Sequence, residues 1–86
     1  MLQDYIHAAI RHANYEILPE DGSIYCEIPE CQGVYAKAQT VEEARNEIIE
    51  TLEDWLFIRL RKNLEIPVIN NINLNVMELA YASFSS

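Results

Sequence analysis

Residues 41 to about 63 predict one long helix with two chemically different faces. At about 100° per residue, the apolar side chains occupy an arc of roughly 140°: Val41, Ala44, Ile48, Ile49, Leu52, Trp55 and Leu56. Six carboxylates occupy the other side: Glu42, Glu43, Glu47, Glu50, Glu53 and Asp54. A helix with one apolar face must bury it against another element, so the rest of the chain has to supply a surface for it.

Both ends of this helix are marked in the sequence. Thr40 and Glu43 have the spacing of a capping box, in which the Thr side chain accepts a hydrogen bond from the Glu amide. Arg59, Arg61 and Lys62 lie in the last turns, where the helix dipole favours cations. The pattern therefore predicts the limits of the helix as well as its faces.

Phe57, Ile58 and Leu60 break the two-sided pattern, because they extend around the helix onto the side that carries acids further up. A helix that is apolar all round is buried all round. We expect the last turns to be covered by the N-terminal helix or by a second copy, and the three residues are candidate oligomer contacts.

A second amphipathic helix is predicted at residues 2–13, where apolar residues fall on one side of a helical wheel. Three strands should follow in a meander, because apolar residues alternate at residues 14–18, 23–28 and 34–38. Pro19 and Gly22 place a tight turn between the first two strands. The third strand then leads into the capped helix.

A fourth strand is predicted near the end of the chain, where Ile72, Leu74 and Val76 alternate with asparagines. The pattern does not show which strand would pair with it. The predicted fold is α+β in the order αβββαβ, with both helices on one face of the sheet. We expect a single domain at residues 1–80 and a polar, frayed tail at residues 81–86, beyond Leu79.

The charge balance is strongly acidic, with 14 Asp and Glu against 6 Lys and Arg, a net charge of −8 in 86 residues. Direct binding to nucleic acid needs cations that replace counterions on phosphates, and anionic membranes would also repel this surface. A basic protein partner would be attracted to it. The alternative is that the charge only keeps a small protein soluble. Because a core of this size gives only a small free energy of folding, homo-oligomerisation is also expected.

The remaining reactive residues predict no cofactor, metal site or catalytic centre. His7 and His12 are five positions apart on a helix, so they point in different directions and cannot share a metal ion. Cys26 and Cys31 form no disulfide framework; we expect Cys26 to be a buried apolar residue and Cys31 an inert loop thiol. No signal peptide or membrane span is visible, which favours the cytoplasm.

From residue 15 to residue 55, the order of motifs resembles the HicB-like antitoxin family. The shared features are a Tyr-rich first strand, a tight turn, a Pro-Glu-x-x-Gly loop and a capped helix ending near an aromatic residue: Tyr15, Asp21-Gly22, Ile28-Pro29-Glu30-x-x-Gly33, Thr40-x-Glu42-Glu43-Ala44 and Trp55. The chain departs from the family in having Cys31-Gln32 where Leu-Pro is common and Ala38-Gln39 before the Thr. The N-terminal helix is an addition to the minimal pattern.

The resemblance implies a partial ribonuclease-H-like fold and the neutralisation of a small basic RNA-cleaving toxin. Family members that repress their own promoter carry a separate DNA-binding segment. The ten residues after Val76 are too few for one, so DNA binding is not implied here. A structural or regulatory homo-oligomer without a toxin is the alternative function, and a metal-dependent ribonuclease is the third.

Two groups of residues are candidates for partner binding. The acidic side chains of the long helix would mimic RNA phosphates in a basic groove, or else form an ordinary solvated face. Tyr25 and Tyr35 alternate away from the core, and they would form either a partner contact or a cross-strand pair. For the ribonuclease hypothesis, Glu16 or Glu27 would join an acid of the long helix around two metal ions. Ordinary solvent-facing strand acids are the competing interpretation.

Overall fold

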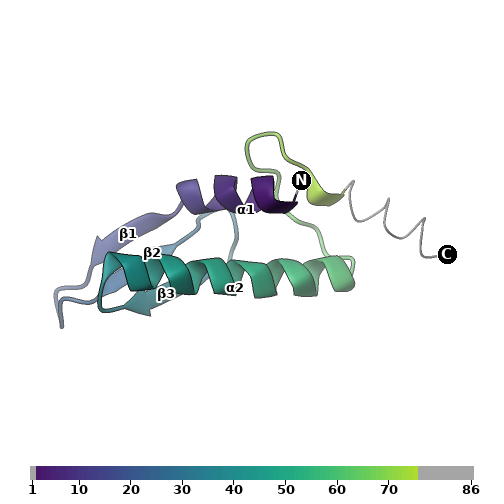
Figure 1. Ribbon diagram of the computed structural model, residues 1–86. Coiled ribbons are helices and arrows are strands. Elements are labelled where there is room, and N and C mark those ends of the chain that lie inside the picture. The colour runs from purple at the N-terminus through teal and green to yellow at the C-terminus, as the bar shows by residue number, and fades with distance from the viewer. Residues whose placement is uncertain (1, 76–86) are drawn as a thin grey trace.

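The computed structural model describes residues 2–75 (Figure 1). Within that range, a helix α1 (Leu2–Arg11) is followed by strands β1 (Asn14–Ile17), β2 (Ile24–Glu27) and β3 (Tyr35–Ala38) and then by a long helix α2 (Val41–Arg61). The two predicted helices and the three-stranded meander are therefore confirmed, and both helices end slightly earlier than predicted. The tail at residues 81–86, together with Val76 and Leu79, lies outside the described residues.

The three strands form an antiparallel sheet in the order β1-β2-β3. Tyr15 lies opposite Cys26, and Cys26 lies opposite Ala36, so these three side chains share one face of the sheet, called here the inner face. Helix α2 packs on β2 and β3 from this side, while α1 packs against α2 and continues into β1. The chain is thus a small α+β fold in which the second helix covers two of the three strands.

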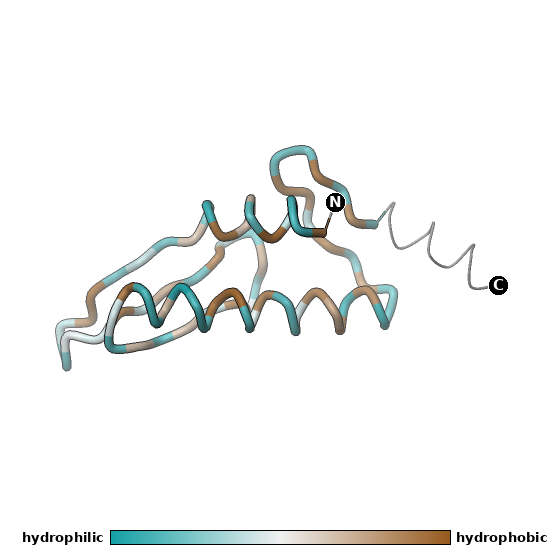
Figure 2. The backbone as a smooth tube through the Cα atoms, viewed as in Figure 1, coloured by the Kyte–Doolittle hydropathy of each residue, from teal (hydrophilic) through white to brown (hydrophobic). Residues whose placement is uncertain are grey.

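The core lies between the two helices, the inner face of β2 and β3, and the segment after α2. Ile48 and Leu52 of α2 are fully buried, and hydrophobic residues recur along both helices in Figure 2. Burying a side chain of this size contributes about 1.5–3 kcal/mol. The Thr40 hydroxyl accepts a hydrogen bond from the Glu43 amide at 3.1 Å and donates one to the Glu43 carboxylate at 3.1 Å. The capping box is therefore confirmed at the first residue of α2.

The turn between β1 and β2 is held by its side chains as well as by its backbone. The Asp21 carboxylate accepts hydrogen bonds from the amide and the hydroxyl of Ser23, at 3.0 and 2.6 Å. These bonds hold the pKa of Asp21 below its ordinary value. Gly22 adopts a φ of 73°, which a residue with a side chain rarely reaches.

The predicted fourth strand is not present in the described part of the chain. Ile72 pairs only with Ile69 in an isolated bridge, and Leu74 and Asn75 are helical. Asparagines explain the difference. Asn70 and Asn71 both adopt a positive φ and make a tight turn, and the Asn73 side chain accepts a hydrogen bond from the Asn75 amide as a helix cap does.

The segment after α2 is anchored to the rest of the fold by side-chain hydrogen bonds. The buried Tyr5 hydroxyl of α1 donates to the Pro67 carbonyl at 2.7 Å. The Asn75 side chain accepts from the Ile66 amide at 3.1 Å and donates to the Ile66 carbonyl at 3.0 Å. Side chains thus replace the strand pairing that the alternating pattern predicts.

Candidate partner-binding surface

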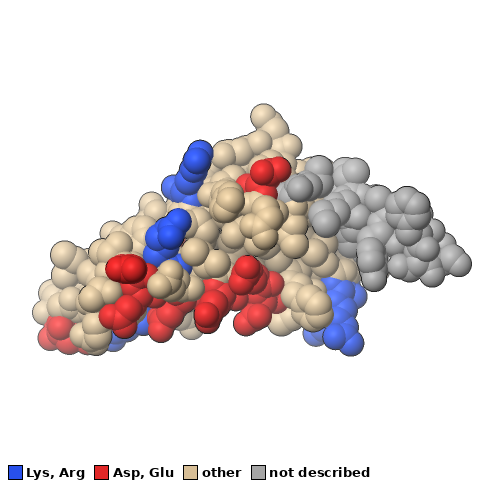
Figure 3. Space-filling model, in the orientation of Figure 1, with Lys and Arg blue, Asp and Glu red and all other residues tan. Residues whose placement is uncertain are grey.

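The outer face of α2 carries all six predicted carboxylates, and each of them is exposed to solvent. Figure 3 shows acidic side chains in a row along α2, with cationic side chains at one end. Within residues 2–75, none of the six forms an ion pair; the pairs there join Lys37 to Asp21 and His12 to Glu30. Glu43 also belongs to the capping box, so part of its role is structural. The remaining five are available to a cationic partner.

The predicted pair of tyrosines lies on the opposite side of the molecule. Tyr25 and Tyr35 project from the outer face of the sheet, where their rings stack with centroids 6.2 Å apart and an interplanar angle of 28°. Burial raises the pKa of Tyr25, and Tyr35 is exposed. The structure therefore confirms a cross-strand contact on this face. Because the sheet and α2 lie between them, the tyrosines and the carboxylates cannot form one surface.

The apolar residues near the end of α2 are only partly covered. Phe57 and Ile58 are exposed, whereas Leu60 is half-buried beside Leu2 of α1. The Arg61 guanidinium lies 6.0 Å from the centre of the Phe57 ring. Helix α1 thus covers one of the three residues, and the other two stay candidates for contact with another chain.

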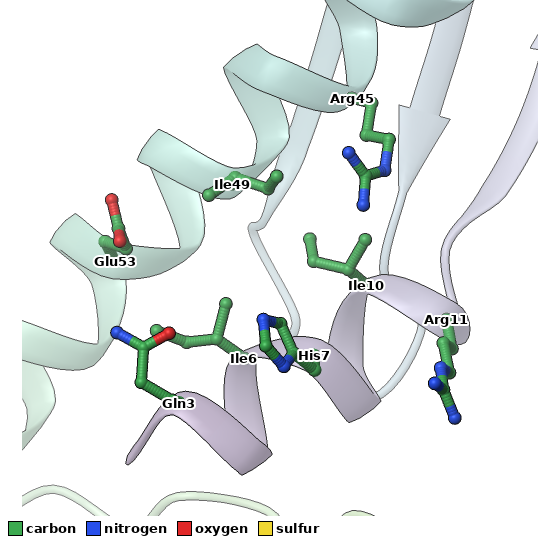
Figure 4. Close-up of a pocket in the computed structure, with 8 residues that line it drawn as sticks. All are labelled: Gln3, Ile6, His7, Ile10, Arg11, Arg45, Ile49 and Glu53. Carbon is green, nitrogen blue, oxygen red and sulfur yellow. The ribbon is translucent and has the colours of Figure 1, made fainter.

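A groove between α1 and α2 is a feature that the sequence analysis missed. Ile6, Ile10 and Ile49 line it, and Arg11 and Arg45 stand at its border (Figure 4). Arg45 reaches from α2 toward Ile10, whereas Arg11 points away, so the two guanidinium groups do not converge on one ligand. The position of Arg45 on the apolar arc of α2 was the available signal, because a long cationic side chain there can border an apolar groove and still reach water.

His12, just after α1, forms a small polar cluster with Glu30 and Asn70, called here the histidine cluster. His12 Nδ1 lies 2.7 Å from Glu30 Oε2, and His12 Nε2 lies 3.1 Å from Asn70 Oδ1. The contact with Glu30 raises the pKa of His12, and His12 in turn lowers the pKa of Glu30. Both oxygens accept hydrogen bonds at once only from an imidazolium, which carries hydrogen on both nitrogens. The arrangement connects α1 to the loops at Glu30 and Asn70.

The two cysteines are free and buried. Cys31 contacts the Tyr5 hydroxyl at 3.8 Å, and Cys26 lies on the inner face of β2. Burial raises the pKa of both thiols, which disfavours the reactive thiolate. Cys26 is therefore the apolar core residue that the sequence predicts, while Cys31 is buried although it lies in a loop.

Comparison with known protein families gives a match to the UPF0150-like family model over residues 4–67, which extends from α1 to just beyond α2. The chain belongs to the UPF0150-like family. This family is related to the HicB-like antitoxins, in agreement with the motifs between residues 15 and 55. The match includes most of α1, which the sequence analysis treated as an addition, and it ends before the segment predicted as a fourth strand.

One solved structure supports the family membership at the level of the fold. The crystal structure of TTHA0281 from Thermus thermophilus is 29% identical in sequence, with a TM-score of 0.78 over 84% of this chain and 89% of that one. No curated protein matches the chain. The UPF0150-like fold therefore places α2 and its carboxylates on a scaffold shared with a protein of similar size.

The geometry separates the carboxylates that a metal-dependent nuclease would need. Glu16 lies opposite Tyr25 and so projects from the outer face with Glu27, away from the carboxylates of α2. Among residues 2–75, no three His, Cys, Asp or Glu side chains are grouped so that they would hold a metal ion. Neither described helix is long and apolar enough to cross a membrane. The exposed α2 face stays the most developed candidate surface of this UPF0150-like chain.

Proposed function

We propose that this UPF0150-like protein is an antitoxin-type binding module. It neutralises a small basic RNA-cleaving toxin by covering the RNA-binding surface or the catalytic residues of the toxin with α2. The row of exposed carboxylates on α2, none of them in an ion pair within residues 2–75, is the observation that carries the proposal.

The position of these carboxylates supports a binding role. A buried face fixes α2 against β2 and β3, so the acidic side chains are presented on a rigid rod rather than on a loop. The carboxylates lie on successive turns of α2, so they form a line of negative charges, as the phosphates of an RNA strand do. Charge of one sign on one face also speeds the encounter with a basic partner, most strongly at low ionic strength.

The direct test is co-expression with a small basic protein that is encoded beside this chain in its source genome. We expect the pair to co-elute in size-exclusion chromatography and the chain to restore growth that the basic protein arrests. The complex should weaken as salt is raised, because the contact is electrostatic and exposed.

A matched pair of triple variants separates the site from net charge. Glu47→Lys, Glu50→Lys and Asp54→Lys together should abolish binding and growth rescue. Glu20→Lys, Glu27→Lys and Glu65→Lys change the net charge equally at exposed positions that are not part of α2, and this control should retain most of the binding. If both triple variants lose binding equally, the binding depends on the net charge of the protein and not on the acidic face of α2. Absence of any complex with the basic neighbour would count against the toxin hypothesis and favour a homo-oligomer without a toxin partner.

A further inference from the structure

Strand β1 has an apolar inner face that no described element covers. Tyr15 and Ile17 lie opposite Cys26 and Ile24, so all four side chains are on the face where α2 packs. Ile24 is only 8% exposed, yet Ile17 is 69% exposed and Tyr15 is 40% exposed. The difference arises because the contacts of α2 with the sheet are concentrated on β2 and β3.

The same two residues also direct their backbone groups away from the sheet. The Leu18 amide donates to the Ser23 carbonyl at 2.8 Å, which makes these two residues a hydrogen-bonded pair of the antiparallel ladder. Such pairs alternate along the strands, so Glu16 bonds across to β2, and the N–H and C=O groups of Tyr15 and Ile17 point to the other side. The described part of the chain supplies no strand there.

Strand β3 is the other edge of the sheet, and it is protected. Ala36 on its inner face is buried under α2, and Lys37 projects a charge from this edge strand, 3.6 Å from Asp21. Edge lysines and covered faces are common devices against strand addition. Strand β1 carries one charge on its outer face, Glu16, but its inner face is not covered, so β1 is the edge that is less protected against strand addition.

The border of the uncovered face carries charges of both signs. Arg45 lies close enough to Tyr15 for its charge to oppose the rise in the Tyr15 pKa that burial causes. Glu42 lies three residues earlier on α2, on the neighbouring part of the same helix face, and both side chains are exposed. Two such borders related by a two-fold axis would place the arginine of each opposite the glutamate of the other.

We propose that a second copy of this chain adds its own β1 antiparallel to β1, which joins the two sheets into one of six strands. A two-fold axis at Glu16 places Tyr15 of each copy opposite Ile17 of the other. This register forms four backbone hydrogen bonds and pairs apolar side chains on the inner face. It also brings the two Glu16 side chains together on the outer face, which opposes the association.

The proposed β1–β1 contact involves short strands, so the dimer is expected to be weak. Four residues extend over roughly 13 Å, and total interfaces below about 1,200 Å² are typical of weak complexes. We therefore expect a dimer that forms reversibly at micromolar or higher concentration. It uses Glu42 at its border but leaves Glu47, Glu50 and Asp54 of α2 exposed, so the three residues that test the proposed toxin contact do not take part in the dimer.

Sedimentation velocity on the full chain over a wide concentration range tests the proposal. Ile17→Pro removes only an amide that points away from β2, so the β1–β2 ladder keeps its hydrogen bonds, while the dimer loses two of its four. We expect the dissociation constant to rise about tenfold or more. Lys37→Pro makes the equivalent change on the open side of β3 and should leave it unchanged.

A second pair of variants tests the register. Glu16→Gln should tighten the dimer by about threefold because it removes a like-charge pair at the axis. Glu27→Gln removes the same charge from the same face one strand away and should have little effect. Tightening by Glu16→Gln alone supports the two-fold axis, and equal effects of both variants would overturn it.

Two outcomes would contradict the proposed dimer. A wild-type chain that stays monomeric at millimolar concentration overturns the proposal. So does a dimer that survives Ile17→Pro in a folded protein, which would place the contact elsewhere, for example at Phe57. Circular dichroism checks the fold, and Ile17→Lys serves as a second disrupting variant if the proline variant does not fold.

Discussion

The two edge strands of the sheet share an alternating pattern of side chains but have different surroundings. Both β1 and β3 alternate apolar and polar side chains, and both pair with β2 on one side. Ala36 of β3 is buried beneath α2, whereas Ile17 of β1 is largely exposed on the same face. Alternation along a strand therefore shows which side chains share a face, but it does not show whether a second layer covers that face.

The largest expected effect concerns the covered half of the sheet. Leu52→Ala should lower the free energy of unfolding by about 3 kcal/mol, because Leu52 is fully buried and its truncation leaves a cavity between α2 and the sheet. Urea denaturation followed by circular dichroism measures the change. Phe57→Ala, also on α2 but exposed, serves as the control and should cost much less. Similar losses in both variants would show that α2 does not cover β2 and β3 as described.

The faces of α2 were the most predictable part of the fold. The apolar arc, the acidic arc and the Thr40 cap depend on residues within one helix, and their spacing determines them directly. The hairpin of β1 and β2 was predictable as well, because the turn residues around Gly22 lie between two alternating segments, but its register comes from the structure. Local patterns thus determined the elements and the exposure of the candidate carboxylates.

The parts that could not be predicted depend on contacts between distant segments. The alternation of Ile72 and Leu74 suggested a strand, but Asn70, Asn71 and Asn73 use their turn and capping chemistry instead. The exposure of Ile17 depends on where α2 crosses the sheet, and the alternation within one strand does not predict that position. The separation of the tyrosines from the carboxylates has the same cause, since it follows from the layer order rather than from either motif.

Tyr5→Phe tests the anchor on the side of the fold where α1 leads into β1. The variant keeps the ring but removes the hydroxyl that donates to the Pro67 carbonyl at 2.7 Å. We expect a loss of about 1–2 kcal/mol in the free energy of unfolding, since the carbonyl loses its donor. Hydrogen exchange should show faster opening in residues 62–75 than in β2. Unchanged exchange in that segment would mean that the hydroxyl does not hold it.

Thr40→Ala tests the attachment of α2 above β3. Loss of the cap removes the acceptor for the Glu43 amide and should cost about 1 kcal/mol. Thr40→Ser retains the hydroxyl and should restore most of that loss. Hydrogen exchange is expected to rise in the first turn of α2 and to change little in β1. An equal rise in β1 would contradict the idea that α2 stabilises only the covered strands.

The histidine cluster predicts a pH dependence of stability on the α1 side. The folded-state pKa of His12 is raised, so its contribution is fully present below the ordinary value of 6.5 and is lost as pH rises through the folded value. The pKa of Glu30 is lowered, so its contribution is present above 4.5 and is lost as pH falls. The urea midpoint should therefore decline as pH rises above the ordinary His12 pKa of 6.5. His12→Gln should flatten this decline, and an unchanged decline would show that other groups cause it.

The smallest change in the free energy of unfolding is expected for a substitution on β1. This substitution tests the difference between the uncovered and covered strands most directly. Ile17 and Ile24 lie opposite each other on one rung of the sheet, with the same side chain on the same face. At concentrations where the chain is monomeric, Ile17→Ala should change the free energy of unfolding by no more than about 0.5 kcal/mol, as is usual for exposed positions. Ile24→Ala should cost about 2 kcal/mol or more, because Ile24 is buried beneath α2. The residue type and the sheet face are the same, so the difference between these variants measures what the helix layer contributes together with the second neighbouring strand of Ile24. Equal losses would mean that β1 is covered in solution even in the monomer, and the exposed inner face of β1 would then be ruled out.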